Sequence, residues 1–336
     1  MKRMLMLLAG RVRVAGVAGR VGLVLLTSLT ASGALAQTWP ARPVRLIVPY
    51  APGGATDILA RLVAQKLTGD LGQSVFVDNK PGGGSVIGTQ AVSQAEPDGH
   101  TLGFLDIAFA TNPGLLKDKL PYDSLRDFAP LSQVAIAPLV MVVHPSVPAK
   151  SVAGFLDFAR RNAGKVNYSS GGIGSGTHLA GEQFKVVTGT DILHVAYKGA
   201  GPGIQAIVAG EVQLTYATPA SIVGHVNSGR VVALAILANA RLSLLPNVPT
   251  VADVGMANLS ASPFFGAFAP PRTAPALQAS IERAFVRYAT DPEVQKQLRQ
   301  QGFEPVGSGR EAFADFLRAE IQRWNNVIAR ANIKPE

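Results

Sequence analysis

The sequence predicts an α/β protein built from two lobes, with a binding site between them. Short apolar strand patterns alternate with stretches of helical periodicity, and glycine-rich turns join a strand to a helix at four places. A chain of 336 residues with 47% apolar and only 16% charged side chains can bury two ordinary cores. Such alternation is typical of parallel sheets with helices on both faces, where ligands bind at the carboxyl ends of the strands.

The first glycine-rich turn lies between Val48 and Asp57. The apolar run before it, 44–48, predicts a buried strand, and apolar residues recur at helical spacing over 58–67. Two glycines in the turn let the backbone approach a ligand closely, and Thr56 is expected to cap the helix. Because the N–H groups of a first helical turn have no partner inside the helix, we expect this turn to bind an anion.

Three further turns of the same kind follow along the chain. They lie at 78–85, 169–177 and 198–203, each after a predicted strand. The helices that follow them are expected at 86–94, 178–187 and 204–209. Because the four turns fall into two pairs, we expect each lobe to contribute one pair and the site to lie between the lobes.

The remaining elements predict how the chain divides into lobes. The apolar run 131–143 is expected to cross between the lobes, and 264–269 to return to the first lobe as a strand. The segment from Pro275 to the end is expected to be wholly helical. Lobe 1 is therefore assigned to 37–138 and 263–336, and lobe 2 to 139–262.

Residues 1–36 have the pattern of a secretory signal peptide. Basic residues precede the apolar segment 21–26, and Ala34 and Ala36 are small residues suited to cleavage. We expect a cut after Ala36 and a periplasmic location. The leader holds five basic residues and no acidic ones, which leaves 26 basic and 22 acidic residues, a net charge of +4. The chain has no cysteine, so both a lipid-anchored form of export and disulfides are excluded.

Composition and motifs argue against several classes of function. Basic residues do not cluster with aromatic ones as nucleic-acid binding requires. The segment Gly201 to Ala206 matches the letters of a dinucleotide fingerprint, but Pro202 removes a backbone donor and no acidic residue follows at the required distance. The five histidines show no metal-ligand spacing. We therefore expect no nucleic acid, no cofactor and no metal.

An exported hydrolase acting on a small ester or amide is the alternative function. Its nucleophile would be Ser175 with His178 as the base, although the segment around Ser175 lacks the flanking glycines of G-x-S-x-G. His178 could equally cap or pack a helix, and Lys198 could either meet an anion or lie at a solvated rim. Asp57 and Asp106 could favour a cationic ligand group, but an acid in a first helical turn, such as Asp57, also suits the helix dipole.

A series of motifs carries a resemblance to a known family. The motifs are Arg45 to Asp57, Asp78 to Gly84 followed by Ile87 and Gly88, Pro97 to Leu102, Leu120 to Asp123, His144 to Pro148, Ser175 to Leu179, His194 to Gly199 and Leu245 to Thr250. In this order they resemble the Bug/TctC receptors of tripartite tricarboxylate transporters. The similarity covers essentially all of the chain after the leader.

The resemblance implies a two-lobed periplasmic binding fold, type II-like, with parallel-rich sheets flanked by helices and a ligand cleft between the lobes. It implies a receptor, not an enzyme, that binds a small organic anion, a mono- or dicarboxylate. We expect a monomer that hands its ligand to membrane transporter subunits or signals to a sensor protein. Transferred by motif, the first-lobe contacts would come from Tyr50, Gly53, Gly54, Thr56, Asp57, Gly83 and Gly84. The second-lobe contacts would come from Ser170, Ser175, Thr177, His178, Tyr197 and Lys198.

One position departs from the family pattern and bears on the ligand. Many members carry an aspartate after the strand that here ends Gln213 to Tyr216, whereas this chain has Ala217. An aspartate there could pair with an amino group of the ligand. Ala217 therefore predicts a carboxylate without an amino group.

Overall fold

The computed structural model describes residues 39–334 except 260, 331 and 332. The predicted signal peptide and its cleavage site lie outside the described residues. The chain from Trp39 onward belongs to one compact unit that contains two β-sheets. Within the described ranges, no helix combines the length and the apolar character needed to cross a membrane.

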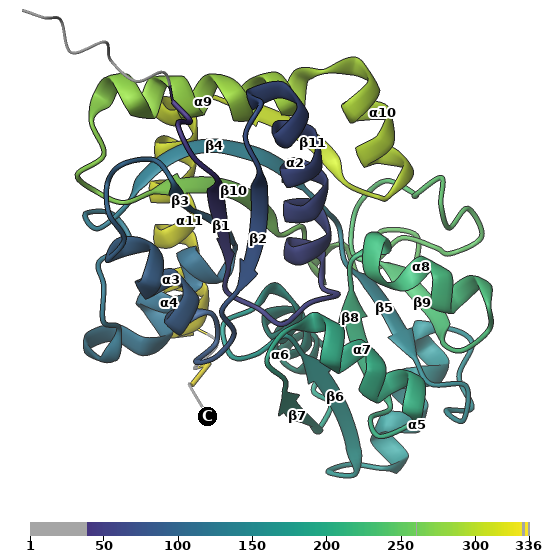
Figure 1. The fold of residues 1–336 in the computed structure, drawn as a ribbon. Helices are drawn as coiled ribbons and strands as arrows, with labels where there is room; N and C mark the ends of the chain where they lie inside the picture. The colour runs from purple at the N-terminus through teal and green to yellow at the C-terminus, as the bar shows by residue number, and fades with distance from the viewer. Residues whose placement is uncertain (1–38, 260, 331–332, 335–336) are drawn as a thin grey trace, which may run out of the picture. The chain divides into compact units, whose positions relative to one another are not determined.

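The first sheet has six strands in the order β11-β4-β10-β3-β1-β2 (Figure 1). Its strands are β1 (Val44–Val48), β2 (Val75–Asn79), β3 (Thr101–Asp106), β4 (Ala129–Ile136), β10 (Phe264–Ala269) and β11 (Glu304–Ser308). Strand β1 pairs in parallel with β2 and β3, whereas β10 and β11 pair antiparallel to their neighbours. The sheet is therefore mixed, and two of its three parallel strands, β1 and β2, lead into the first pair of glycine turns.

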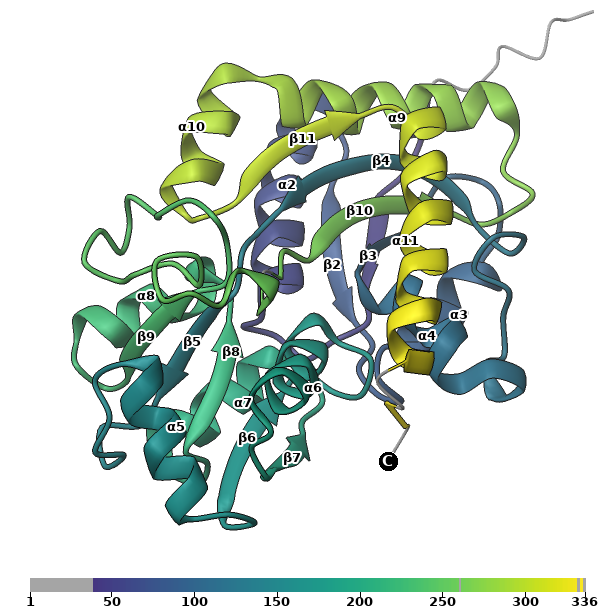
Figure 2. The same cartoon turned by 180° about the vertical axis from the view of Figure 1, so that it is seen from behind.

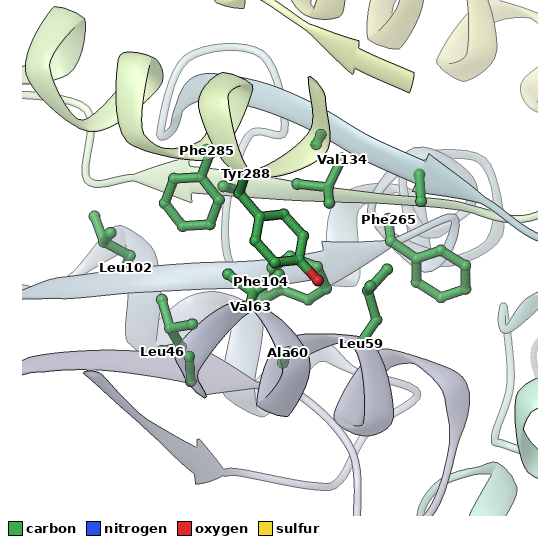
Figure 3. Packing of buried hydrophobic residues seen from close by; sticks show 14 of the residues in the cluster. Leu46, Leu59, Ala60, Val63, Leu102, Phe104, Val134, Phe265, Phe285 and Tyr288 are labelled. Carbon is green, nitrogen blue, oxygen red and sulfur yellow. The ribbon is translucent and has the colours of Figure 1, made fainter. Parts of the chain in front are cut away.

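Helices cover both faces of the first sheet. They are α2 (Ala55–Leu71), α3 (Val86–Ser93), α4 (Ala108–Leu116), η1 (Lys117–Lys119), α9 (Pro275–Thr290), α10 (Pro292–Gln300) and α11 (Arg310–Arg330). Helix α2 lies in front of the sheet in Figure 1, and α11 lies in front of it in Figure 2. Adjacent residues of β1 accordingly enter different cores: Leu46 packs with Phe285 and Tyr288 (Figure 3), while Ile47 packs with Phe313. The prediction of helices on both faces is confirmed.

The second sheet has five strands in the order β7-β6-β8-β5-β9. Its strands are β5 (Val140–Val143), β6 (Val166–Ser170), β7 (Ile192–Ala196), β8 (Leu214–Ala217) and β9 (Val232–Ile236). The helices of this lobe are α5 (Val152–Arg161), α6 (Gly176–Thr188), α7 (Ala200–Ala209), α8 (Pro219–Asn227) and η2 (Ala257–Leu259). Strand β6 pairs in parallel with β7 and β8, and β5 pairs antiparallel with β8 and β9. Here too, two of the three parallel strands, β6 and β7, lead into glycine turns.

Two short segments connect the sheets, one after β4 and one before β10. They run side by side, because Ala137 N donates to Pro263 O at 3.0 Å and Leu139 N donates to Ala261 O at 3.1 Å. Such paired connections are suited to a hinge between two lobes. The residue boundaries assigned to the lobes stay a prediction.

Three local predictions are wrong. The C-terminal part is not wholly helical, because Glu304–Ser308 forms β11 at the edge of the first sheet, where a strand with Pro and Gly and little apolar alternation is tolerated. Helix α7 begins at Ala200, inside the predicted loop, because a proline in a first helical turn removes no helical hydrogen bond. Thr56 is not the cap of α2; Gly54 occupies that position.

Candidate functional site

A small cavity of about 40 Å³ lies between the two sheets. This volume has room for about three water molecules. It is lined from the first lobe by Tyr50, Gly54, Ala55, Thr56, Asp106 and Phe265, from the second lobe by Gly171, Ser175, Gly176, Thr177, Ala200 and Thr218, and from the connecting segments by Leu139 and Pro263. A cavity therefore lies between the lobes, and its use as the ligand site stays a prediction.

The N-termini of four helices meet at this cavity. The N-cap residues Gly54 of α2, Ser175 of α6 and Thr218 of α8 line it, as does Ala200, the first residue of α7. The N–H groups of a first turn have no intrahelical acceptor, and the helix dipole adds partial positive charge there. The four N-termini together create an environment for an anion. Helix α2 comes from the first lobe, and α6, α7 and α8 come from the second.

On the first-lobe wall, the hydroxyls of Tyr50 and Thr56 are bound to Asp106. Tyr50 Oη donates to Asp106 Oδ1 at 2.8 Å, and Thr56 Oγ1 donates to Oδ2 at 3.1 Å. The backbone N–H of Ala108 also donates to Oδ1, at 3.1 Å. Burial raises the pKa of Asp106, although these three hydrogen bonds favour its charged form. Burial and the neighbouring Asp106 also raise the pKa of Tyr50, so its hydroxyl keeps its hydrogen.

The second-lobe wall holds Ser175 and Thr177 in a different way. Their hydroxyl oxygens lie 3.0 Å apart and share a hydrogen bond. Each oxygen also accepts a backbone N–H: Ser175 Oγ from His178 at 3.3 Å, and Thr177 Oγ1 from Gly171 at 2.9 Å. Two hydroxyls carry two hydrogens, and one is used between them, so the pair can donate the other to a ligand.

Several predicted site residues line a second, outer cavity of about 330 Å³. Gly83, Gly84, Tyr197 and Lys198 contribute to this cavity and not to the inner one. Tyr50 and Gly171 line both cavities, so they stand between the two spaces. The two glycine turns of the first lobe therefore serve different spaces.

Gly53 and Asp57 do not line the inner cavity. Gly53 N donates to Asp57 Oδ2 at 3.0 Å, and Asp57 Oδ1 lies 2.9 Å from Arg61 and accepts from Asn79 at 2.9 Å. Although burial opposes its charged form, the hydrogen bonds from Arg61, Asn79 and Gly53 lower the pKa of Asp57. In this structure Asp57 fixes the glycine turn, a structural role that differs from the helix-dipole interaction expected from the sequence.

Ser170 and His178 are buried beneath the second-lobe wall. Ser170 Oγ lies 2.5 Å from His194 Nε2 and accepts from Gly172 N at 3.0 Å. The ring of His178 packs 4.4 Å from that of His194, and its Nδ1 accepts from Gly174 N at 3.2 Å. Burial lowers the pKa of His178 to about 4, so the ring is neutral at pH 7.

Ala217 lies in the apolar core of the second lobe, with no exposed surface. It packs in the same cluster as Val140 and Ile204, and the next residue, Thr218, lines the cavity instead. Two polar side chains that line the cavity, Asp106 and Thr218, were not among the predicted site residues. Asp106 was predictable, since an acid directly at the carboxyl end of a predicted strand is a ligand position in such sheets.

The arrangement around Ser175 does not form a nucleophile and base pair. Ser175 Oγ accepts the backbone N–H of His178, while the imidazole Nδ1 is engaged by Gly174 N. A serine hydrolase needs the ring of the base within hydrogen-bond reach of the serine. Within the described part of the chain, no group of three or more His, Cys, Asp or Glu residues could hold a metal ion.

Comparison with known proteins gives the family of this chain. The model of the tripartite tricarboxylate transporter family receptor, TctC, matches residues 59–333. The chain belongs to this family. It is 35% identical to protein BugT of Bordetella pertussis over 315 residues, which cover 94% of this chain and 97% of BugT.

Solved structures agree with this assignment. An adipate-bound protein of R. palustris has 31% identity and a TM-score of 0.85, and covers 89% of this chain with 100% of its own. The malate-bound MatC of Rhodopseudomonas palustris has 28% identity and a TM-score of 0.81, and covers 86% of this chain with 100% of its own. The chain therefore has the two-lobed fold of periplasmic binding proteins. It is a solute-binding receptor and not an enzyme, as the sequence predicted.

Proposed function

We propose that this TctC receptor binds a small organic carboxylate between its lobes in the periplasm and delivers it to the membrane subunits of a tripartite transporter. One observation carries the proposal: four helix N-termini from both lobes meet at one small cavity. Among the described residues, no basic side chain lines this cavity. The carboxylates bound by two related structures, adipate and malate, support this ligand class. The leader-like residues 1–36 support export.

Backbone and hydroxyl donors are sufficient for useful affinity without a basic side chain. A charge-assisted hydrogen bond contributes about 1.5–3 kcal/mol. Micromolar affinity corresponds to about 8 kcal/mol. Several bonds from first-turn N–H groups and from the Ser175–Thr177 pair reach this range, after the cost of ordering the ligand is subtracted.

The two cavities divide the predicted contacts into an inner and an outer set. We propose that the inner cavity, with Tyr50, Gly54, Thr56, Ser175 and Thr177, holds the carboxylate and the atoms next to it. The outer cavity, with Gly83, Gly84, Tyr197 and Lys198, receives the distal end of a longer ligand. The sensor protein stays the alternative partner to the transporter.

Isothermal titration of the purified chain with small mono- and dicarboxylates tests the ligand class. We expect at least one acid to bind with micromolar affinity and its fully methylated ester, in which no carboxylate remains, to bind at least tenfold more weakly. Native mass spectrometry of protein purified without refolding would identify a co-purified anion. The proposal fails if folded protein, verified by circular dichroism, binds no carboxylate or binds acid and ester equally.

Delivery needs a separate test in cells. Deleting the gene for the receptor should abolish uptake of the radiolabelled ligand found by titration, and a plasmid copy should restore it. Uptake that persists after deletion, with an altered transcriptional response to the ligand, would favour a sensor partner instead.

A further inference from the structure

Asp106 is the charged side chain among the described residues that line the inner cavity. Only 8% of its surface is exposed, and the partners of its carboxylate are the neutral donors Tyr50, Thr56 and Ala108 N. A buried carboxylate without a cationic partner is costly, and the raised pKa of Asp106 reflects that cost. This acid lies in the wall of a cavity whose other features favour an anion.

The hydrogens of the neighbouring hydroxyls are already used. A hydroxyl has a single hydrogen, and both Tyr50 Oη and Thr56 Oγ1 donate theirs to Asp106. Toward the cavity, Thr56 Oγ1 therefore presents lone pairs. Asp106 Oδ1 accepts two hydrogen bonds, whereas Oδ2 accepts one and has capacity for another. This part of the wall accepts hydrogen bonds and does not donate them.

A carboxylate of the ligand cannot be stabilised against an accepting wall. It would meet lone pairs and a negative charge there, whereas the helix N-termini and the Ser175–Thr177 pair supply donors elsewhere in the same cavity. The group facing Asp106 must donate hydrogen bonds. An ammonium group has three N–H donors and a positive charge, so it satisfies Oδ2 and Thr56 Oγ1 and also neutralises the buried acid.

We infer that Asp106 determines specificity by binding an ammonium group, so that the ligand is a small carboxylate that also carries an amino group. This inference rests on the proposed function and narrows its ligand class. It reverses the expectation drawn from Ala217. That residue packs in the apolar core, so its lack of a carboxylate does not affect the cavity, whereas Asp106 brings one from the opposite lobe.

Matched pairs of ligands test the inference on the unmodified protein. Titrations would compare aspartate with succinate, glutamate with glutarate and alanine with propionate, and malate and lactate would supply the hydroxyl analogues. In the pair that binds, we expect the amino compound to bind about 30-fold more tightly or better than its amino-free partner. The hydroxyl analogue should fall between the two, because it donates one hydrogen bond without a charge.

The variant D106N gives the residue-level test. Asparagine has nearly the same shape but no negative charge, so the preference for the amino compound should fall by about 30-fold while the amino-free partner binds as well as before or better. The control D157N changes an exposed acid on α5 and should preserve the preference. Thermal unfolding of both variants verifies that they are folded.

Three results would overturn the inference. An amino-free or hydroxyl compound that binds as tightly as its amino partner contradicts it and leaves the proposed carboxylate receptor standing. An unchanged preference in folded D106N shows that another group reads the ligand. If no member of any pair binds, the inference fails together with this choice of ligand class. The ligand pairs decide the question even if D106N does not fold.

Discussion

The two walls of the inner cavity use the same kinds of side chain and reach opposite polarity. On the first-lobe wall, the hydroxyls of Tyr50 and Thr56 donate to Asp106, so these side chains can only accept from a ligand. On the second-lobe wall, the oxygens of Ser175 and Thr177 already accept backbone N–H groups, so the pair has a hydrogen to donate. The partner behind a hydroxyl, and not the hydroxyl itself, decides what it offers to a ligand.

Protonation of a buried group at each wall also has opposite effects on the free energy of unfolding. Behind the second-lobe wall, His178 is buried in its neutral form, with a pKa lowered to about 4. As pH falls from about 6.5 to 4, the unfolded chain binds this proton more readily than the folded chain, so the free energy of unfolding decreases. The shift corresponds to a loss of about 3 kcal/mol. Asp106 has the opposite sign, because its raised pKa means that protonation favours the folded state.

The first prediction concerns this acid sensitivity and is the largest effect. The variant H178N keeps an acceptor for Gly174 N and removes the titrating ring, so its free energy of unfolding should fall about 3 kcal/mol less than that of the unmodified chain between pH 7 and pH 4. Urea unfolding at the two pH values measures this. The half-buried His144 provides the control variant H144N, which should keep the full acid sensitivity. Equal acid sensitivity of H178N and the unmodified chain would contradict the role given to His178.

The second prediction separates closure of the lobes from the chemistry of the walls. Gly201, in the first turn of α7, meets the first-lobe turn so closely that a Cβ would lie 2.1 Å from Pro52 O. Backbone contact also joins the lobes nearby, where Ala51 N donates to Lys198 O at 2.8 Å. The variant G201A should therefore oppose closure by about 1–3 kcal/mol, which weakens every ligand by about 5- to 150-fold.

The control for G201A is G224A. Gly224 lies in α8 with open space around the position of a Cβ, so this variant should bind as the unmodified chain does. Titration with an amino compound and its amino-free partner measures both variants. A loss of affinity in G201A that is confined to one of the two ligands would mean that Gly201 acts on the ligand itself and not on closure.

Elements that depend on local sequence patterns were predicted, whereas elements that depend on contacts between distant segments were not. The strands and helices next to the glycine turns were predicted because apolar periodicity and glycine position are local signals. Strand β11 was missed because an edge strand needs little apolar alternation, and its pairing partner β4 lies far away in the chain. The start of α7 was missed because Gly201 and Pro202 indicate a loop unless the helix begins around them.

For a similar reason, the sequence could not predict which side chains line the cavity and which of them donate hydrogen bonds. Thr56 was expected to cap α2, but its hydrogen goes to Asp106, 50 residues later in the chain. No local pattern indicates such a bond. Likewise, Ala217 and Thr218 are neighbours at the end of β8, and only the packing of that strand decides that Thr218 lines the cavity and Ala217 enters the core. The sequence predicted glycine turns that line this cavity but left the polarity of its walls open.

The smallest predicted effect tests the polarity of the two walls directly, with one chemical change made on each. Valine replaces threonine with almost the same shape, so T56V and T177V each remove one hydroxyl. In T177V, Ser175 loses the neighbour that orients its hydroxyl and Gly171 N loses its acceptor, so amino and amino-free ligands should both bind about fivefold more weakly. In T56V an acceptor beside Asp106 is lost, so only the amino ligand should weaken, by about the same factor. If T56V instead weakened the amino-free ligand, Thr56 would be donating to the carboxylate, and the two walls would not differ in the way their hydrogen bonds indicate.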